Sequence, residues 1–263
     1  MLFLKTLGIS VSISTLGFYK FIYFITISYG LSIATIGVFL LYKTNINLTL
    51  VEIILSILYI FYGLRLALFL LIREVKNKSY KQKMSNEINI GNHMRFLYKI
   101  IIWLSVALLY ACQASPLTFR TLSNVKDDNL VYVSIIIMIF GLLLEIKADR
   151  EKGTAKKINP KRFVDTGLYK IVRCPNYLGE VIFWTGNLIG GFKIYEGGFQ
   201  WFIAIFGYIL IIYIMFSGSR RLEIRQNKSY GKDPMYQKYV KNTPILIPFL
   251  PLYTLEKYTW IKV

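Results

Sequence analysis

Histidine, cysteine and acidic residues are all scarce in this chain. Its 263 residues include one histidine (His93), two cysteines, and 14 acidic residues against 32 Lys and Arg. A single histidine excludes metal sites built from several histidines, and His93 gives no convincing place for a Ser-His-Asp triad. No GxGxxG motif follows a strand-like run, so a Rossmann nucleotide site is not indicated. We expect no metal site.

Long apolar runs dominate what is present. The chain is 55% hydrophobic with a mean hydropathy of +0.47, which is too apolar for an ordinary soluble domain. The runs are about 17–25 residues long, enough to span about 30 Å of hydrocarbon as helices. The sequence therefore predicts one all-α domain over 1–263, a multi-pass membrane bundle of about seven transmembrane helices. We place these spans near 2–19, 21–42, 48–72, 95–115, 130–148, 176–192 and 199–216.

The cationic residues orient these spans. They gather in the segments 73–94 and 149–175 and in the tail after Phe216, whereas the intervening loops carry few. The first of these segments contains Lys78, Lys81 and Lys83. With an odd number of spans all three segments share one side, which the positive-inside rule assigns to the cytosol. We predict a lumenal or outside N-terminus and a cytosolic C-terminus.

The net charge of +18 is explained by the same pattern. Lys and Arg beside membrane spans follow the positive-inside bias and contact anionic membrane lipids. We therefore expect membrane lipids as partners and no nucleic acid. The topology also places Cys112 and Cys174 near opposite faces, so we expect no disulfide between them.

Several polar side chains lie inside the predicted spans or at their edges. Arg65 is in the middle of the third span, with Tyr62 one turn before it. Glu145 and Asp149 lie one turn apart at the cytosolic end of the fifth span, as do Asn176 and Glu180 at the start of the sixth, where Tyr177 adjoins them. A charge at bilayer depth costs about 2.5–3.5 kcal/mol on insertion scales, so such groups usually face a functional cavity.

Two interpretations of these groups remain open at this point. Arg65 could form an internal ion pair with Glu145 or Glu180 that only holds the helices in register. Alternatively, the groups could bind a ligand, with cytosolic cations gripping its phosphates. Arginine suits phosphates through bidentate hydrogen bonds, and Arg162 and Arg173 flank the Asn176–Glu180 helix start.

Three segments resemble the steroid 5-alpha-reductase family, including its bacterial and protist relatives of unassigned substrate. FVDTGLYKIVRCPNYLGEVIFWTG is similar to that family's D-T-G-L-W-x-x-x-R-H-P-N-Y-x-G-E run. FYGLRLALFLLIRE looks like its third span, and YGKDPMYQKYVKNTPILIPFLP is similar to its closing Y-x-x-Y…L-I-P-F run. The resemblance covers residues 50–250.

The resemblance implies a seven-span enzyme that binds NADPH in its cytosolic half and takes a lipid-like substrate from the membrane. It would reduce a carbon–carbon double bond conjugated to a carbonyl in a sterol, polyprenal or enoyl compound. Tyr62 matches the tyrosine that polarises the carbonyl, with Arg65 one turn on. Asn176 and Glu180 match the nicotinamide contacts. The remaining expected cofactor contacts are Arg73, Lys76, Glu145, Asp149, Lys156, Arg162, Arg173 and Tyr177.

The chain departs from the family pattern at two places. Steroid-reducing members use a glutamate from an early loop, whereas the first acidic residue here is Glu52. The family's R-H-P is Arg173-Cys174-Pro175. The R-x-P-x-Y-x-G spacing leaves a membrane methyltransferase of the isoprenylcysteine carboxyl methyltransferase type, using S-adenosylmethionine, as an alternative. A non-enzymatic membrane protein is the other. In a eukaryote we expect the endoplasmic reticulum.

Overall fold

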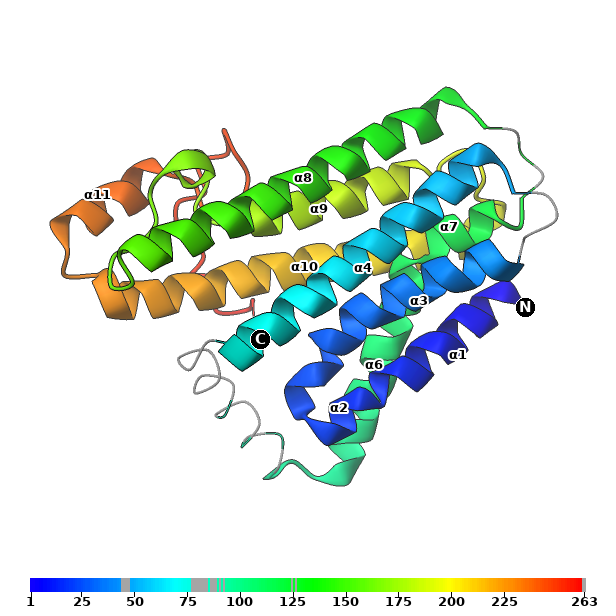
Figure 1. Cartoon of the computed structure of the whole chain (residues 1–263), viewed down its shortest axis with the longest axis horizontal. Coiled ribbons are helices and arrows are strands. Elements are labelled where there is room, and N and C mark those ends of the chain that lie inside the picture. Colours follow the sequence, from blue (N-terminus) through cyan, green and yellow to red (C-terminus); the bar gives the residue numbers. More distant parts are fainter. Residues whose placement is uncertain are drawn as a thin grey trace. The chain divides into compact units, whose positions relative to one another are not determined.

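A computed structural model describes residues 1–43, 48–76, 85, 89, 91, 93–123, 125 and 127–261. Every regular element in those ranges is a helix (Figure 1). This architecture confirms the predicted all-helical, multi-pass bundle. Lys78, Lys81 and Lys83 lie outside the described residues, and the predicted orientation stays a prediction.

Six helical segments of the described chain are long and apolar enough to cross a membrane, one fewer than predicted. They are Leu2–Tyr19, Phe21–Tyr42, Leu50–Lys76, Phe96–Gln113, Asn129–Ile158 and Gly197–Tyr230. The span predicted near 176–192 forms α9 (Pro175–Ile189), which has only 15 residues. At 1.5 Å per residue it covers about 22 Å, less than the hydrocarbon thickness. The chain is an integral multi-pass membrane protein.

The chain divides into two compact units. Unit 1 comprises residues 1–135 and 187–208, and unit 2 comprises residues 136–186 and 209–263. The boundaries fall inside α8 (Asn129–Ile158), α9 and α10 (Gly197–Tyr230), so each of these helices contributes to both units. The single membrane domain stays a prediction, and each unit is described by itself.

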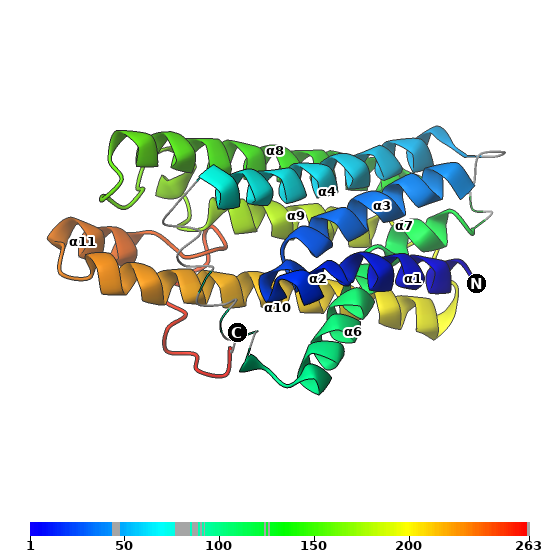
Figure 2. The ribbon, with the colours of Figure 1, turned by 60° about the horizontal axis from the view of Figure 1, so that its bottom comes forward.

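Unit 1 is built on the pair α3 (Ile27–Lys43) and α4 (Leu50–Lys76). In both views α3 lies between α4 and α1 (Leu2–Ser14) (Figure 1, Figure 2). Gly30 and Gly63 let the two backbones meet, because a Cβ on Gly63 would lie 2.2 Å from the Gly30 carbonyl oxygen. The remaining helices that lie wholly within unit 1 are α2 (Leu16–Tyr19), η1 (Phe21–Phe24), α6 (Phe96–Gln113) and α7 (Ser115–Arg120).

A capping box explains where α4 begins. The Thr49 N–H donates to Glu52 Oε2 (2.8 Å), and the Glu52 N–H donates to Thr49 Oγ1 (3.3 Å). These reciprocal bonds satisfy two backbone donors that a helix start leaves exposed. Glu52, which is buried, therefore has a structural role at the start of the helix that carries Tyr62.

Unit 2 contains residues 136–158 of α8, 175–186 of α9 and 209–230 of α10, with η2 (Gly167–Lys170) and α11 (Pro234–Asn242). α8 and α9 run side by side (Figure 1) and meet at Gly141 and Gly179. A Cβ on Gly179 would lie 2.7 Å from both the Glu145 nitrogen and the Gly141 oxygen. Asp233 caps α11 by accepting the Met235 N–H (2.8 Å), with Pro234 in the first turn.

The close approach of Gly30 and Gly63 in unit 1 can be tested by substitution. Gly63→Val is expected to destabilise the protein by about 1–3 kcal/mol or to prevent folding, because the new side chain would overlap backbone atoms that cannot move aside. Gly8→Ala is the matched control, since a Cβ there meets nothing within 4 Å and alanine favours a helix. Thermal unfolding in detergent checks both variants. Equal midpoints would contradict the close approach of α3 and α4.

Candidate functional site

The predicted site residues fall in both units. Tyr62, Arg65, Arg73 and Lys76 lie on α4 in unit 1. Unit 2 holds the other eight, namely Glu145, Asp149, Lys156, Arg162, Arg173, Asn176, Tyr177 and Glu180. Each set belongs to its own unit, and a single site that contains both sets stays a prediction.

Tyr62 belongs to a buried cluster of tyrosines. Its side chain is fully buried, and its hydroxyl lies 2.9 Å from the Tyr29 hydroxyl on α3. Tyr29 in turn stacks on Tyr110 of α6, with ring centroids 5.2 Å apart. The Tyr110 hydroxyl donates to the Phe24 carbonyl oxygen (2.5 Å). These contacts fix the Tyr62 ring and give its hydroxyl a hydrogen-bonding neighbour that the sequence motif did not reveal.

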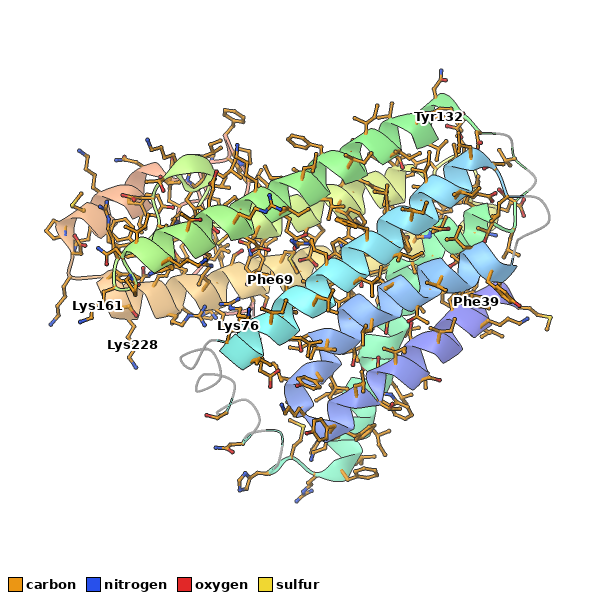
Figure 3. All side chains as sticks on the ribbon, in the orientation of Figure 1. Phe39, Phe69, Lys76, Tyr132, Lys161 and Lys228 are labelled. Atoms are coloured by element: carbon orange, nitrogen blue, oxygen red, sulfur yellow. The ribbon has the colours of Figure 1, made fainter. Side chains whose placement is uncertain are left out.

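The end of α4 is tied to the segment that joins the first two spans. Glu74 accepts hydrogen bonds from Lys20 Nζ (2.7 Å) and from the Tyr23 hydroxyl (3.0 Å). The hydrogen bond to the Glu74 carboxylate raises the pKa of Lys20 above its usual range, so the Lys20 ammonium stays charged. Lys76, labelled in Figure 3, ends the helix and is exposed, while Arg73 is partly buried.

Lys156 and Arg162, two of the predicted cofactor contacts in unit 2, differ in how many hydrogen bonds their charged groups already make within the protein. Lys156 Nζ donates to the Tyr230 hydroxyl (3.0 Å) and to the carbonyl oxygens of Pro160 and Arg162, so it closes the loop after α8. The Arg162 side chain is 46% exposed and pairs with Asp165 at 2.9 Å. Lys161 and Lys228 point away from the ribbon at the same end of unit 2 (Figure 3).

Arg173 forms a buried ion pair that no sequence motif indicated. Its Nη2 lies 3.0 Å from Glu223 Oε1 on α10, and the two side chains are 2% and 1% exposed. Arg173 also donates to the Tyr253 carbonyl oxygen in the C-terminal segment. The second Glu223 oxygen accepts the N–H groups of Leu255 (2.7 Å) and Glu256 (3.1 Å). The charge of Arg173 is thus compensated within unit 2. The only sequence signal was an acidic residue inside the basic run SRRLEIRQNK.

Cys174 stands where relatives of the resembled family carry histidine. Its side chain is buried among Leu222, Ile245 and Leu255, and its N–H donates to the Ile245 carbonyl oxygen (2.9 Å). Burial raises the pKa of the Cys174 thiol, so it stays neutral near pH 7. Both cysteines of the chain are free and buried, as expected. The thiol is therefore a packing group in an apolar cluster.

The start of α9 combines an amide with a buried carboxylate. Asn176 Oδ1 is buried and accepts no hydrogen bond from the residues the structure describes. Glu180, one turn later, is 6% exposed. Glu145, 4% exposed, lies on α8 where Gly179 allows the close contact of the two helices. Tyr177 packs on Gly218 of α10, where a Cβ would lie 3.3 Å from its ring. This part of unit 2 offers buried oxygen acceptors suited to amide N–H donors.

A family model described as "Protein of unknown function (DUF1295)" matches residues 16–243. The chain belongs to the DUF1295 family. The matched region includes every predicted site residue. No curated protein and no solved structure matches the chain. A kinship of this DUF1295 protein with the steroid 5-alpha-reductases stays a prediction.

Unit 1 of the DUF1295 protein contains a second polar cluster that the sequence analysis missed. Arg120 is 2% exposed, donates to the Gly190 carbonyl oxygen (2.8 Å) and pairs with Asp127 (3.4 Å) and Asp128 (3.7 Å). It borders a cavity with room for about one water molecule, also lined by Ser134 and Asn187. Because two carboxylates lie beside it, Arg120 has a structural role and stabilises α7 and the start of α8.

The Arg173–Glu223 pair predicts a large stability effect in the DUF1295 protein. Glu223→Gln is expected to cost about 3–5 kcal/mol, because it leaves the Arg173 guanidinium buried without a compensating charge. Glu256→Gln, an exposed change in the same region, is expected to cost less than about 1 kcal/mol. Chemical denaturation in detergent measures both. If the two variants unfolded at the same midpoint, the ion pair would not hold unit 2 together.

Proposed function

We propose that this protein is a membrane-embedded, NADPH-dependent oxidoreductase that reduces a carbon–carbon double bond conjugated to a carbonyl in a lipid-like substrate. The observation that carries the proposal is the start of α9. There, a buried amide oxygen without a hydrogen bond from the described residues lies one turn from the buried Glu180 carboxylate. The resemblance of the same segment to the reductase motif supports it independently.

The residues at this helix start fit the carboxamide of a nicotinamide ring. A carboxamide presents two N–H donors and one oxygen acceptor. Asn176 Oδ1 and the Glu180 carboxylate can accept those donors, while the Asn176 amide nitrogen can donate to the oxygen. Such a pairing fixes the ring by its substituent and so orients the face from which hydride leaves. Glu145 and Tyr177 border this position in unit 2 and complete its wall.

The phosphates of the cofactor require cations whose charge is available. Arg162 fits best in unit 2, because its guanidinium is exposed and its single acidic partner, Asp165, is a surface pair of little strength. Arg73 and Lys76 are the corresponding candidates in unit 1. Lys156 and Arg173 support the site by holding its loops, and Asp149 lies on α8 about two and a half turns before the helix ends at Ile158.

Tyr62 supplies the group that acts on the substrate. NADPH, when bound, supplies the hydride that adds to the carbon distant from the carbonyl. Negative charge then develops on the carbonyl oxygen, where a preorganised hydroxyl donor stabilises it. The Tyr29 hydroxyl can donate to the Tyr62 oxygen, which would strengthen Tyr62 as a hydrogen-bond donor. Arg65, one turn on along α4, adds positive charge on the side where the oxygen becomes negative.

Ligand-induced stabilisation tests the cofactor class directly. NADPH at about 100 times its dissociation constant is expected to stabilise the detergent-purified protein by about 2.7 kcal/mol, seen as a higher melting temperature. S-adenosylmethionine is measured in parallel and is expected to give no shift. A shift with S-adenosylmethionine alone would instead support the methyltransferase. No shift with either ligand would favour a non-enzymatic protein.

Substitution of Glu180 tests the nicotinamide contact. Glu180→Gln is expected to weaken NADPH binding about 10- to 100-fold, because one charge-assisted hydrogen bond of about 1.5–3 kcal/mol is lost. The melting temperature of the variant without ligand is measured as well, so that weaker binding is distinguished from lower stability. Glu256→Gln is the control for an exposed carboxylate and should bind normally. Unchanged NADPH affinity together with a lower melting temperature would make Glu180 a structural residue only.

A further inference from the structure

The C-terminal segment after α11, residues 244–261, exposes large apolar side chains. Phe249 is 100% exposed, Trp260 67%, Leu250 46% and Tyr253 40%. Single exposed apolar residues are ordinary, but a run of aromatic ones within a short segment indicates a binding surface. Exposure of these apolar side chains to water is unfavourable, which indicates that they contact another molecule.

Phe249 is also held in an unfavourable backbone conformation. Its φ is +66°, the only positive value for a non-glycine residue in the described chain. For a bulky residue this conformation costs about 1–2 kcal/mol. Pro248 and Pro251 flank the position and restrict the neighbouring backbone. The turn therefore holds the Phe249 ring outward at a cost that burial of the ring in an apolar medium would offset.

The segment is fixed to unit 2 and does not hang free. The N–H groups of Arg173 and Cys174 donate to the carbonyl oxygens of Pro244 and Ile245, both at 2.9 Å. Glu223 accepts the Leu255 N–H, and Arg220 donates to the carbonyl oxygens of Ile261 (3.3 Å) and Glu256 (3.2 Å). The exposed side chains are thus carried by a rigid platform.

The attachment points place this platform at the membrane surface. Phe216 is the last residue of the long apolar run of α10, and Arg220 and Glu223 follow it by about 6–10 Å along the helix at 1.5 Å per residue. The polar interface of a bilayer is roughly 5–8 Å thick on each side. Pro244 and Ile245 return to the residues just before α9. The chain therefore leaves the membrane along α10, turns through α11 and comes back to headgroup depth.

The charges around the platform favour an anionic lipid surface. Arg220, Arg221 and Lys257 are partly or fully exposed at this level. The nearby Glu223 is buried and neutralised by Arg173, which leaves Glu256 as the exposed carboxylate of the segment. Aromatic rings with flanking Lys and Arg are typical of side chains that anchor a protein at the bilayer interface.

We propose that residues 244–261 form an interfacial anchor, which inserts Phe249 and its apolar neighbours into the bilayer that the helices span and binds anionic phospholipid through Arg221 and Lys257. The partner is the lipid surface itself. The anchor stabilises the C-terminal segment, and through Glu223 it stabilises the loop before α9. It does not depend on the proposed reductase activity.

A fluorescent label on the full-length protein tests the depth of the anchor. Phe249→Cys, labelled with an environment-sensitive nitrobenzoxadiazole group, is reconstituted in nanodiscs of phosphatidylcholine with and without phosphatidylglycerol. The native Cys112 and Cys174 are both 2% exposed and should resist labelling. Met235→Cys is the matched control, since Met235 is 62% exposed and follows the end of α10 at Tyr230, which lies about 21 Å of helical rise beyond Phe216.

The label at position 249 is expected to emit at shorter wavelength and to be quenched several-fold more by spin-labelled lipid than the label at position 235. Replacement of Arg221 and Lys257 by Gln should reduce that quenching in phosphatidylglycerol nanodiscs only. Water-like emission at both positions would overturn the anchor. Short-wavelength emission at position 249 that persists in detergent and becomes stronger with protein concentration would instead indicate that a second copy of the chain covers this surface.

Discussion

The buried ion pair between Arg173 and Glu223 holds unit 2 together. Two charges removed from water are costly unless their remaining hydrogen-bonding capacity is used. Here the glutamate meets this condition by accepting two backbone N–H groups, whereas the arginine uses Nη2 for both Glu223 and the Tyr253 carbonyl oxygen and leaves Nε and Nη1 buried without a hydrogen bond in the described chain. One interaction therefore joins the loop before α9, the part of α10 that follows Phe216 and the C-terminal segment. The position of Asn176 follows from it, because Asn176 is three residues after Arg173.

This arrangement changes how the basic motif should be interpreted. Arg173 is the first residue of the R-x-P-N-Y motif, and the resemblance alone would assign its side chain to a phosphate. The structure shows that the Arg173 charge is paired with Glu223 inside unit 2, whereas Arg162 keeps an exposed guanidinium; the proposed cofactor would therefore take its positive potential from exposed residues such as Arg162. Arg173 contributes by position: its backbone N–H bonds to Pro244 and its side chain bonds to Glu223 hold the residues that precede α9.

Hydropathy alone was enough to predict the helices but not their ends. The run near 130–148 is confirmed, yet α8 continues to Ile158, because Glu, Lys and Ala keep good helical propensity after the apolar residues stop. α10 likewise continues to Tyr230. α9 is shorter than predicted, and Gly190 and Gly191 follow its end. Hydropathy reports where a helix meets lipid, whereas propensity and capping decide where it stops.

The site could be predicted only in its residue types. Asn176 and Glu180 were found because an amide and a carboxylate are unusual near membrane helices, and Tyr62 because it lies one turn from Arg65 and matches a tyrosine of the resembled family. Their partners could not be found, because which side chain meets which depends on the rotation of each helix about its axis. Glu223 and Tyr29 are the clearest cases, since neither lies in a motif and both are decided by packing.

The pair of Tyr29 and Tyr62 bears on the missing early glutamate. A carboxylate buried among helices must be desolvated and compensated, whereas a phenol is neutral and carries a smaller penalty. Two phenols 2.9 Å apart share one hydrogen bond before any substrate arrives, so each hydroxyl has a polar neighbour in the described structure. When a carbonyl approaches, one hydroxyl can accept from its neighbour and donate to the substrate at the same time. Under the proposed reductase function, a tyrosine pair would therefore supply a hydrogen-bond donor without a second buried charge.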